Sequence, residues 1–251
     1  MRSKALIIVL LIVLLAVLAL SITATVESVL VLYYNENTDI VDYIVLGQSV
    51  LKTIALLIFT LIYCKTWYYG ESPGNAFADL FLFAAALIET RNFYQYTNLT
   101  GQCFIPPVLL ARIQIFAVIL MLLSMINAAL YYNNEYSTIN FLKIISVGIA
   151  LTLSLLLPLP ISYEDIFSLL PSFWILIILC ATAFVANLIL MFTEPPGIGT
   201  FKHLASIVII GGIFAIFFFN LPSSEMVGSV LLTMGYLINA ILSARNAISL
   251  Y

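Results

Sequence analysis

Residues 107–131 read PVLLARIQIFAVILMLLSMINAALY, an apolar run in which Arg112 is the only charged residue. A helix needs about 20 mostly apolar residues to cross the hydrocarbon core of a bilayer, because it rises about 1.5 Å per residue. This run meets that requirement without help from its neighbours. A continuous apolar run predicts a membrane-spanning helix, whereas a strand of a membrane β-barrel would alternate in polarity.

The composition of the whole chain agrees with this reading. The chain has 251 residues, of which 63% are hydrophobic and only 8% are charged. A soluble domain carries about 25% charged residues, because water must wet its surface. A net charge of −3 without a basic patch excludes a nucleic-acid binder, and three cysteines are too few for a disulfide scaffold. The composition therefore predicts an integral membrane protein.

Candidate apolar runs occur eight times, each bounded by prolines, glycines or polar residues that end helices. They cover residues 4–30, 40–64, 75–89, 107–131, 139–157, 172–192, 201–220 and 225–245. The third is the weakest, since Asp79 and Glu89 confine its apolar core to residues 80–88. We predict an all-α polytopic integral membrane bundle of eight transmembrane helices. It would form a single transmembrane domain over residues 1–251, with no soluble domain.

The first run has an alternative interpretation as a cleaved signal peptide. Arg2 and Lys4 precede it, and small residues follow at 21–24. The apolar core of a signal peptide is about 7–15 residues long, whereas residues 5–20 are apolar without a break. This length favours a retained first helix. Cleavage would leave seven spans.

The basic residues predict the orientation, because cytoplasmic loops of membrane proteins collect Lys and Arg. With eight spans and a cytoplasmic N-terminus, only Arg91 and Arg112 fall at outer ends, and Lys52 falls inside a span. The remaining basic residues fall at inner ends: Arg2, Lys4, Lys65, Lys143, Lys202 and Arg245. We therefore expect both termini in the cytoplasm and the protein in a plasma or inner membrane.

The sequence lacks the residues that most membrane enzymes need. It has no Walker A loop and no GxGxxG, and its short connections leave no room for a catalytic domain. The single histidine, His203, supports neither haem ligation nor an intramembrane zinc hydrolase. We expect His203 at the membrane surface. We predict a protein that is not an enzyme and that holds no cofactor and no metal.

Polar side chains inside the spans are the candidates for function, because charges inside a bilayer cost several kcal/mol. Lys52 lies near the middle of the second predicted span, with Gln48 one turn away on the same face. Glu89 ends the third predicted span, and Arg112 opens the fourth. Lys52 then lies roughly 10 Å deeper than Glu89, so a pair between them is feasible but stretched. Glu89 and Arg112 lie at nearly equal depth.

Two hypotheses follow from these depths. The structural hypothesis is that Glu89, Arg91 and Arg112 form an outer cluster of ion pairs between the third and fourth helices. The functional hypothesis is that Gln48, Lys52, Glu89 and Arg112 line an outward-opening pocket for a small or lipid-like anionic ligand. Asp79 would extend an ion or proton path inward.

Small and amide residues predict contacts between helices. Gly211 and Ala215 lie four residues apart and would let the seventh helix pack closely against a neighbour. Asn127, Asn187 and Asn239 are single amides inside their spans, and we expect them to form hydrogen bonds between helices.

The sequence therefore predicts a non-enzymatic membrane protein that acts as a sensory, ligand-binding or accessory subunit through a partner. Its partners would be the lipid bilayer and a membrane protein or a second copy of the chain, and not nucleic acid. The alternative is a small secondary transporter or channel whose polar pathway contains Lys52, Glu89 and Asp79.

Overall fold

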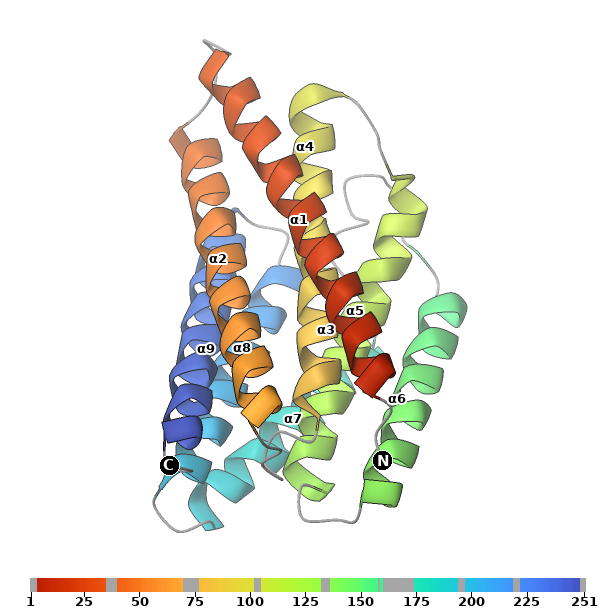
Figure 1. Ribbon diagram of the computed structural model, residues 1–251. Coiled ribbons are helices and arrows are strands. Elements are labelled where there is room, and N and C mark those ends of the chain that lie inside the picture. Colours follow the sequence, from red (N-terminus) through yellow and green to blue (C-terminus); the bar gives the residue numbers. More distant parts are fainter. Residues whose placement is uncertain are drawn as a thin grey trace.

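The computed structural model describes residues 4–34, 40–69, 77–101, 105–131, 136–157, 159, 174–193, 197–218 and 222–248. All regular secondary structure in these residues is helical (Figure 1). The helices are α1 (Lys4–Tyr34), α2 (Ile40–Tyr69), α3 (Ala78–Ile88), η2 (Glu89–Arg91), α4 (Asn92–Thr100), α5 (Pro107–Tyr131), α6 (Tyr136–Leu156), α7 (Trp174–Thr193), α8 (Ile198–Phe218) and α9 (Pro222–Ile248).

The predicted fold class, an all-α polytopic membrane bundle, is confirmed. Seven of the described helices are long and apolar enough to cross a membrane, namely α1, α2 and α5 to α9. The third predicted span corresponds to α3, η2 and α4, which follow one another without leaving right-handed helical geometry. Helix α1 begins and α9 ends at the same end of the bundle (Figure 1), as an even number of passes requires.

The third span is longer than the sequence indicated. We predicted that it ends at Glu89, but the helix continues through η2 and α4 to Thr100 and stops at Gly101, which has a φ of 69°. Glycine adopts this left-handed conformation without steric cost and often ends helices. The apolar run was the wrong guide here, because the polar residues directly after Glu89, namely Thr90, Arg91 and Asn92, are buried.

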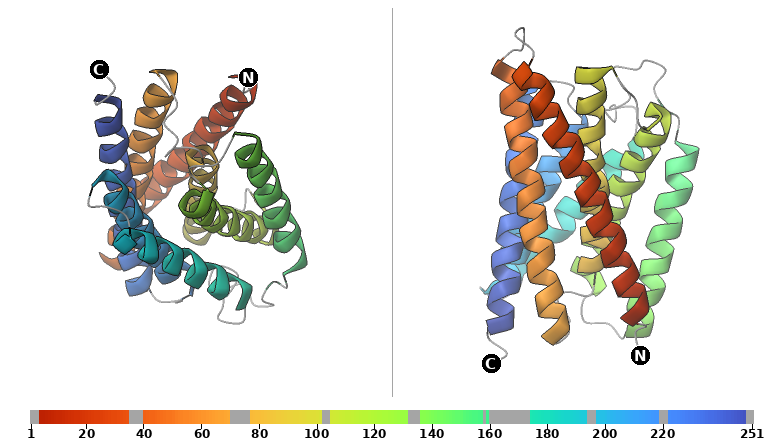
Figure 2. Two further views of the ribbon diagram at one scale, coloured as in Figure 1. Left: turned by 90° about the horizontal axis from the view of Figure 1, so that it is seen from below. Right: turned by 45° about the horizontal axis from the view of Figure 1, so that its top comes forward.

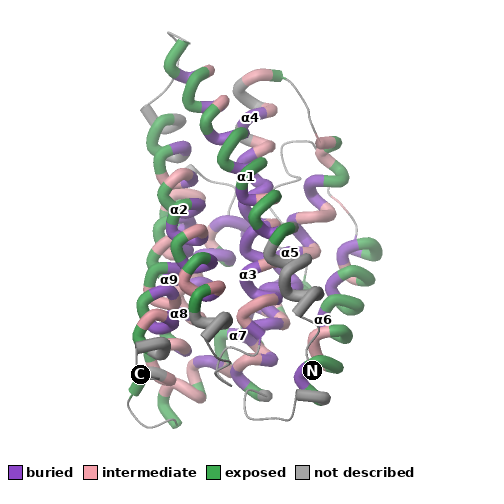
Figure 3. Tube along the Cα trace, viewed as in Figure 1, coloured by how far each residue is buried: buried purple, intermediate pink, exposed green. Residues whose placement is uncertain are grey.

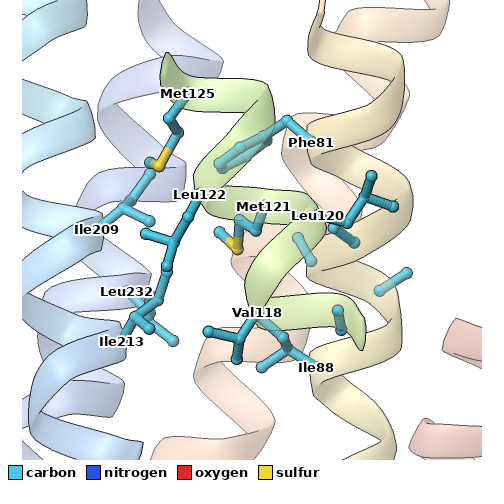
Figure 4. Packing of buried hydrophobic residues seen from close by; sticks show 14 of the residues in the cluster. Phe81, Ile88, Val118, Leu120, Met121, Leu122, Met125, Ile209, Ile213 and Leu232 are labelled. Carbon is cyan, nitrogen blue, oxygen red and sulfur yellow. The ribbon is translucent and has the colours of Figure 1, made fainter. Parts of the chain in front are cut away.

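Helix α5 is the most buried of the seven apolar spans and packs on α3, α6 and α7. On its inner side Met121, Leu122 and Met125 meet side chains of α3, α8 and α9 (Figure 4). Helices α2 and α9 pack together along the opposite side, and α1 leans across α2, α3 and α4 (Figures 1 and 2). This arrangement places the α3–η2–α4 span between α1 and α5.

The outer faces of the bundle are apolar. Buried residues lie on the inward sides of the helices and exposed residues on the outward sides (Figure 3). Helices α6 and α7 are the least buried spans, and α6 exposes Ile144 and Leu156. Exposed side chains of this kind are suited to contact with lipid tails.

Helices α8 and α9 approach each other closely at two glycines. A Cβ atom on Gly212 would lie 2.9 Å from the carbonyl oxygen of Gly228, and one on Gly228 would lie 2.8 Å from that of Gly212. A Cβ on Gly211 would meet Leu231 at an ordinary 3.7 Å. The seventh predicted span therefore does pack closely through a small residue, but through Gly212 and not through Gly211.

Two of the three amides join helices as expected. Asn127 donates to the Ser146 hydroxyl across α5 and α6 at 2.8 Å. Asn187 of α7 shares a 3.0 Å hydrogen bond with the Nδ1 atom of His203. That histidine is buried and lies in the second turn of α8, near one end of the span. Asn239 donates within its own helix, to the carbonyl of Gly235 at 3.2 Å.

Candidate functional site

A buried ion pair joins α2 to the third span. The Nζ atom of Lys52 lies 3.6 Å from Oε2 of Glu89, and the two side chains are 3% and 0% exposed. We expected this pair to be stretched, because the predicted span ended at Glu89. Since eleven further helical residues follow Glu89, the carboxylate lies about 17 Å below the end of the helix. That depth matches the depth of Lys52 in α2.

The two carboxylate oxygens of Glu89 have different surroundings. Oε2 faces Lys52 and also accepts a 2.9 Å hydrogen bond from the Thr53 hydroxyl. Oε1 is buried and has no hydrogen-bond partner among the described residues. Buried polar atoms nearly always have a partner, so Oε1 is an acceptor that a hydrogen-bond donor would stabilise.

Tyr236 of α9 belongs to the same site. Its side chain is fully buried, and its hydroxyl group has no hydrogen-bond partner among the described residues. It lies close enough to Glu89 for an electrostatic interaction. Its ring packs edge-on against Phe81 at 6.3 Å between centroids, and Phe81 packs against Phe59 at 6.1 Å. Phe81 lies between Asp79 and Glu89 along the third span, so these three rings form an aromatic layer on the Asp79 side of the ion pair.

Gln48 lies one helical turn from Lys52, on the face where we expected it. Its side chain is half-buried, and its Oε1 oxygen is another buried acceptor without a described partner. We predicted that four residues line a pocket. The structure brings three of them to one region, namely Gln48, Lys52 and Glu89.

A seam of hydrogen bonds continues from the ion pair toward the end of α4. Ser49 donates to Oδ1 of Asn92 at 2.5 Å, and Nδ2 of Asn92 donates to Thr25 at 3.1 Å. All three residues are buried. The seam ties α1, α2 and α4 together one turn away from Glu89.

Arg112 is directed away from this site. Its guanidinium group donates to the backbone carbonyls of Ser154, at 2.6 Å, and Leu157, at the end of α6. The expected contact between Arg112 and Glu89 is wrong, because Arg112 donates to backbone carbonyls at the end of α6 and Glu89 pairs with Lys52. Arg112 satisfies carbonyls that the end of a helix leaves without an intrahelical donor.

Arg91 has a different acidic partner from the one we expected. Its Nε atom lies 3.1 Å from Oε1 of Glu225 in the first turn of α9. Its guanidinium group also lies 5.5 Å from the centre of the Phe217 ring. The predicted cluster of Glu89, Arg91 and Arg112 is therefore replaced by a Lys52–Glu89 pair, an Arg91–Glu225 pair and an arginine bound to backbone.

Gln114 supports the short 3₁₀ segment that carries Glu89. Its amide nitrogen donates to the carbonyls of Leu87 and Ile88, at 3.1 and 3.3 Å, and to the hydroxyl of Thr90 at 2.7 Å. A 3₁₀ segment within a long helix often marks a functional site or a strained sequence. Here a side chain of α5 stabilises the change in helix geometry from outside.

Asp79 lies at the other end of α3 and is already paired. Its carboxylate accepts two hydrogen bonds from Lys143 of α6, at 2.7 and 2.6 Å. It is ten residues from Glu89, or about 15 Å along the helix. The buried residues between them are apolar: Leu80, Phe81, Leu82, Ala84, Ala85, Ala86 and Ile88. The described side chains of α3 therefore provide no polar path between the two carboxylates.

Sequence reasoning missed Tyr236 and Asn92. Tyr236 is the only aromatic residue within the predicted span 225–245, and that isolation was the available signal. Asn92 was assigned to a connection because it follows the apolar core of the third span. No group of three or more potential metal-binding His, Cys, Asp or Glu residues occurs in the described ranges.

No family model matches the sequence, and the comparisons with curated proteins and with solved structures give no match.

Proposed function

We propose that this protein is a non-enzymatic, multi-spanning membrane protein that binds a small ligand at the Lys52–Glu89 pair and acts through a partner, as a sensory or accessory subunit. The observation that carries the proposal is the fully buried Glu89 carboxylate with one unpartnered oxygen. A buried acceptor left without a donor costs about 1–3 kcal/mol. A bound ligand that donates a hydrogen bond would remove this cost.

The proposed binding residues are Gln48, Lys52 and Glu89, with Tyr236 added. Ionisable residues within membrane spans usually mark sites of function. Unpartnered oxygens occur on Glu89 itself, on Gln48 one turn from Lys52, and on Tyr236 of α9. Arg112 is left out of the site, because α6 carbonyls accept its hydrogen bonds.

The position of Glu89 suggests how binding would be communicated. Glu89 begins the 3₁₀ segment between α3 and α4, and Thr53 of α2 donates to it. A ligand that competes for the carboxylate would weaken the link between α2 and the third span. A partner that binds these helices in the membrane would respond to the change in the contact between them.

We do not extend the proposal to transport through Asp79. The alternative pathway of Lys52, Glu89 and Asp79 requires polar groups between the two carboxylates, and α3 has buried apolar side chains there. Proton- or salt-dependent uptake into liposomes that is lost on Lys52→Met would favour transport over a sensory or accessory role.

We propose that the protein lies in a plasma or inner membrane and that both termini are on its cytoplasmic side. Lys65, Lys143 and Lys202 support this orientation, since basic residues collect on the cytoplasmic side. Arg2 lies outside the described residues. The apolar outer faces of α6 and α7 are suited to lipid and equally to a membrane partner or a second copy of the chain.

The test is purification of the tagged protein from its native membrane in mild detergent, followed by mass spectrometry of co-eluting proteins and small molecules. We expect a stoichiometric partner chain and a bound small molecule, with the small molecule lost from Lys52→Met. Lys143→Met is the matched control, because it removes a lysine from a partly buried pair at the other end of α3.

A monodisperse protein without a partner would contradict the subunit role. A small molecule that stays bound to Lys52→Met, or is lost equally from Lys143→Met, would contradict the proposed site.

A further inference from the structure

We infer that the Lys52–Glu89 site takes a ligand that carries no net charge and offers both hydrogen-bond donors and acceptors, such as a zwitterion with an ammonium and a carboxylate group. This inference rests on the proposed function and specifies its ligand class. It differs from the anionic ligand that the sequence predicted, because the charges around Glu89 differ from those expected.

The first argument is the charge balance of the buried site. The predicted pocket combined Lys52 and Arg112 with Glu89, which leaves one positive charge in excess. In the structure Arg112 donates to α6 and Arg91 pairs with Glu225. One cation and one anion remain, both at most 3% exposed. A net charge added here would be buried without a counter-charge, which costs several kcal/mol.

The second argument is the hydrogen-bonding capacity of the site. Oε1 of Glu89 and Oε1 of Gln48 are acceptors without described partners, so a ligand with donor groups would satisfy them. The Lys52 ammonium group has three N–H donors, and its contact is with Glu89 at 3.6 Å. An acceptor group on the ligand would give these donors a closer partner than the 3.6 Å contact. The Tyr236 hydroxyl can do either.

The third argument is the isolation of the pair from the other charges of α3. The rings of Phe59, Phe81 and Tyr236 pack against one another, and Phe81 lies on α3 between Asp79 and Glu89. Asp79 and Lys143 neutralise each other at the far end of the helix. Neither can compensate a charged ligand at Glu89.

The experiment uses three small probes of similar size at pH 7: glycine as the zwitterion, acetate as the anion and ethylammonium as the cation. Each is added to the purified full-length protein in detergent, and the melting temperature is measured. The double variant Lys52→Met with Glu89→Met gives the baseline, because it carries no buried charge at the site and reports non-specific effects of the probes.

We expect glycine to raise the Tm of the wild-type protein by about 2–4 °C above that baseline at several times its Kd, with no such rise from acetate or ethylammonium. The preference should change with the charge that remains. Lys52→Met leaves one anion and should respond to ethylammonium, whereas Glu89→Gln leaves one cation and should respond to acetate. Lys143→Met should keep the wild-type preference for glycine.

A wild-type response to acetate or to ethylammonium in place of glycine would overturn the inference about the ligand class and leave the binding site in place. A lack of response to every probe in the wild type and in both single variants would overturn the binding site itself, and with it the proposed function. If the single variants do not fold, the comparison of the wild type with the double variant still decides between these outcomes.

Discussion

Lys52 and Glu89 form the pair whose energetics differ most from those of a surface ion pair. Exposed ion pairs contribute less than about 1 kcal/mol. Removing one partner of a buried pair leaves the other charge uncompensated, which costs about 3–5 kcal/mol. We therefore expect Lys52→Met to lower the free energy of unfolding by about this amount, measured by denaturant titration in mixed micelles.

The double variant Lys52→Met with Glu89→Met provides the control for that prediction. Replacement of a whole buried pair by apolar residues is often neutral or stabilising, so the double variant should be more stable than Lys52→Met alone. A double variant as unstable as the single variant would show that packing, and not charge, accounts for the loss.

At the residue scale, the sequence identified the charged side chains of the site but not the residues with which they pair. Lys52, Glu89 and Arg112 were recognisable because charges are rare inside apolar runs. Their pairing depends on which helices are neighbours, and no periodicity in one helix reports that. Glu225 and Ser154 are far from Arg91 and Arg112 in the sequence, so neither contact could be deduced.

At the scale of elements, the 3₁₀ segment Glu89–Arg91 depends on α5. We expect Gln114→Leu to lower the free energy of unfolding by about 1–3 kcal/mol, because it removes the amide that donates to two carbonyls and to Thr90. The measurement is denaturant unfolding in mixed micelles. Asn239→Leu is the control, since Asn239 donates within its own helix. Equal losses in both variants would contradict the special role of Gln114.

The close crossing of α8 and α9 allows a second prediction at the scale of elements, which concerns the stability of a glycine variant. We expect Gly228→Ala to destabilise the protein by about 1–3 kcal/mol, as overpacking of a tight contact does. Its Cβ would lie 2.8 Å from a backbone oxygen that has little room to move. The measurement is thermal unfolding in detergent.

Gly47→Ala is the matched control for this substitution. A Cβ on Gly47 would have no neighbour within 4 Å, and alanine favours a helix over glycine by about 1 kcal/mol. Gly47→Ala should therefore be neutral or stabilising. A neutral Gly228→Ala would show that the two helices can separate without cost.

The elements themselves were the most predictable part of the fold. Apolar length located α1, α2 and α5 to α9, because a bilayer imposes nearly the same requirement on every span. It failed for α4, whose residues are polar. Helix α4 is stabilised by tertiary contacts, such as those of Asn92 with Ser49 and Thr25, which no single-helix pattern contains.

At the scale of the whole molecule, the shared end of α1 and α9 (Figure 1) allows the orientation to be tested. Fusion of green fluorescent protein after Tyr251 should give fluorescent bacterial cells. Green fluorescent protein folds in the cytoplasm and not after export to the periplasm. Fusion of alkaline phosphatase at the same place should give an inactive enzyme. The reverse pattern would contradict the proposed cytoplasmic termini.

The charge pairs of the third span also constrain how the chain is made. This span contacts Lys52 of α2, Lys143 of α6 and Glu225 of α9, which leave the ribosome in that order. The partner on α2 is thus synthesised before the third span, the partner on α6 after it, and the partner on α9 at the end of the chain. Completion of the charge network must wait for the final helix, so a chain truncated before α9 would leave Arg91 without the Glu225 carboxylate.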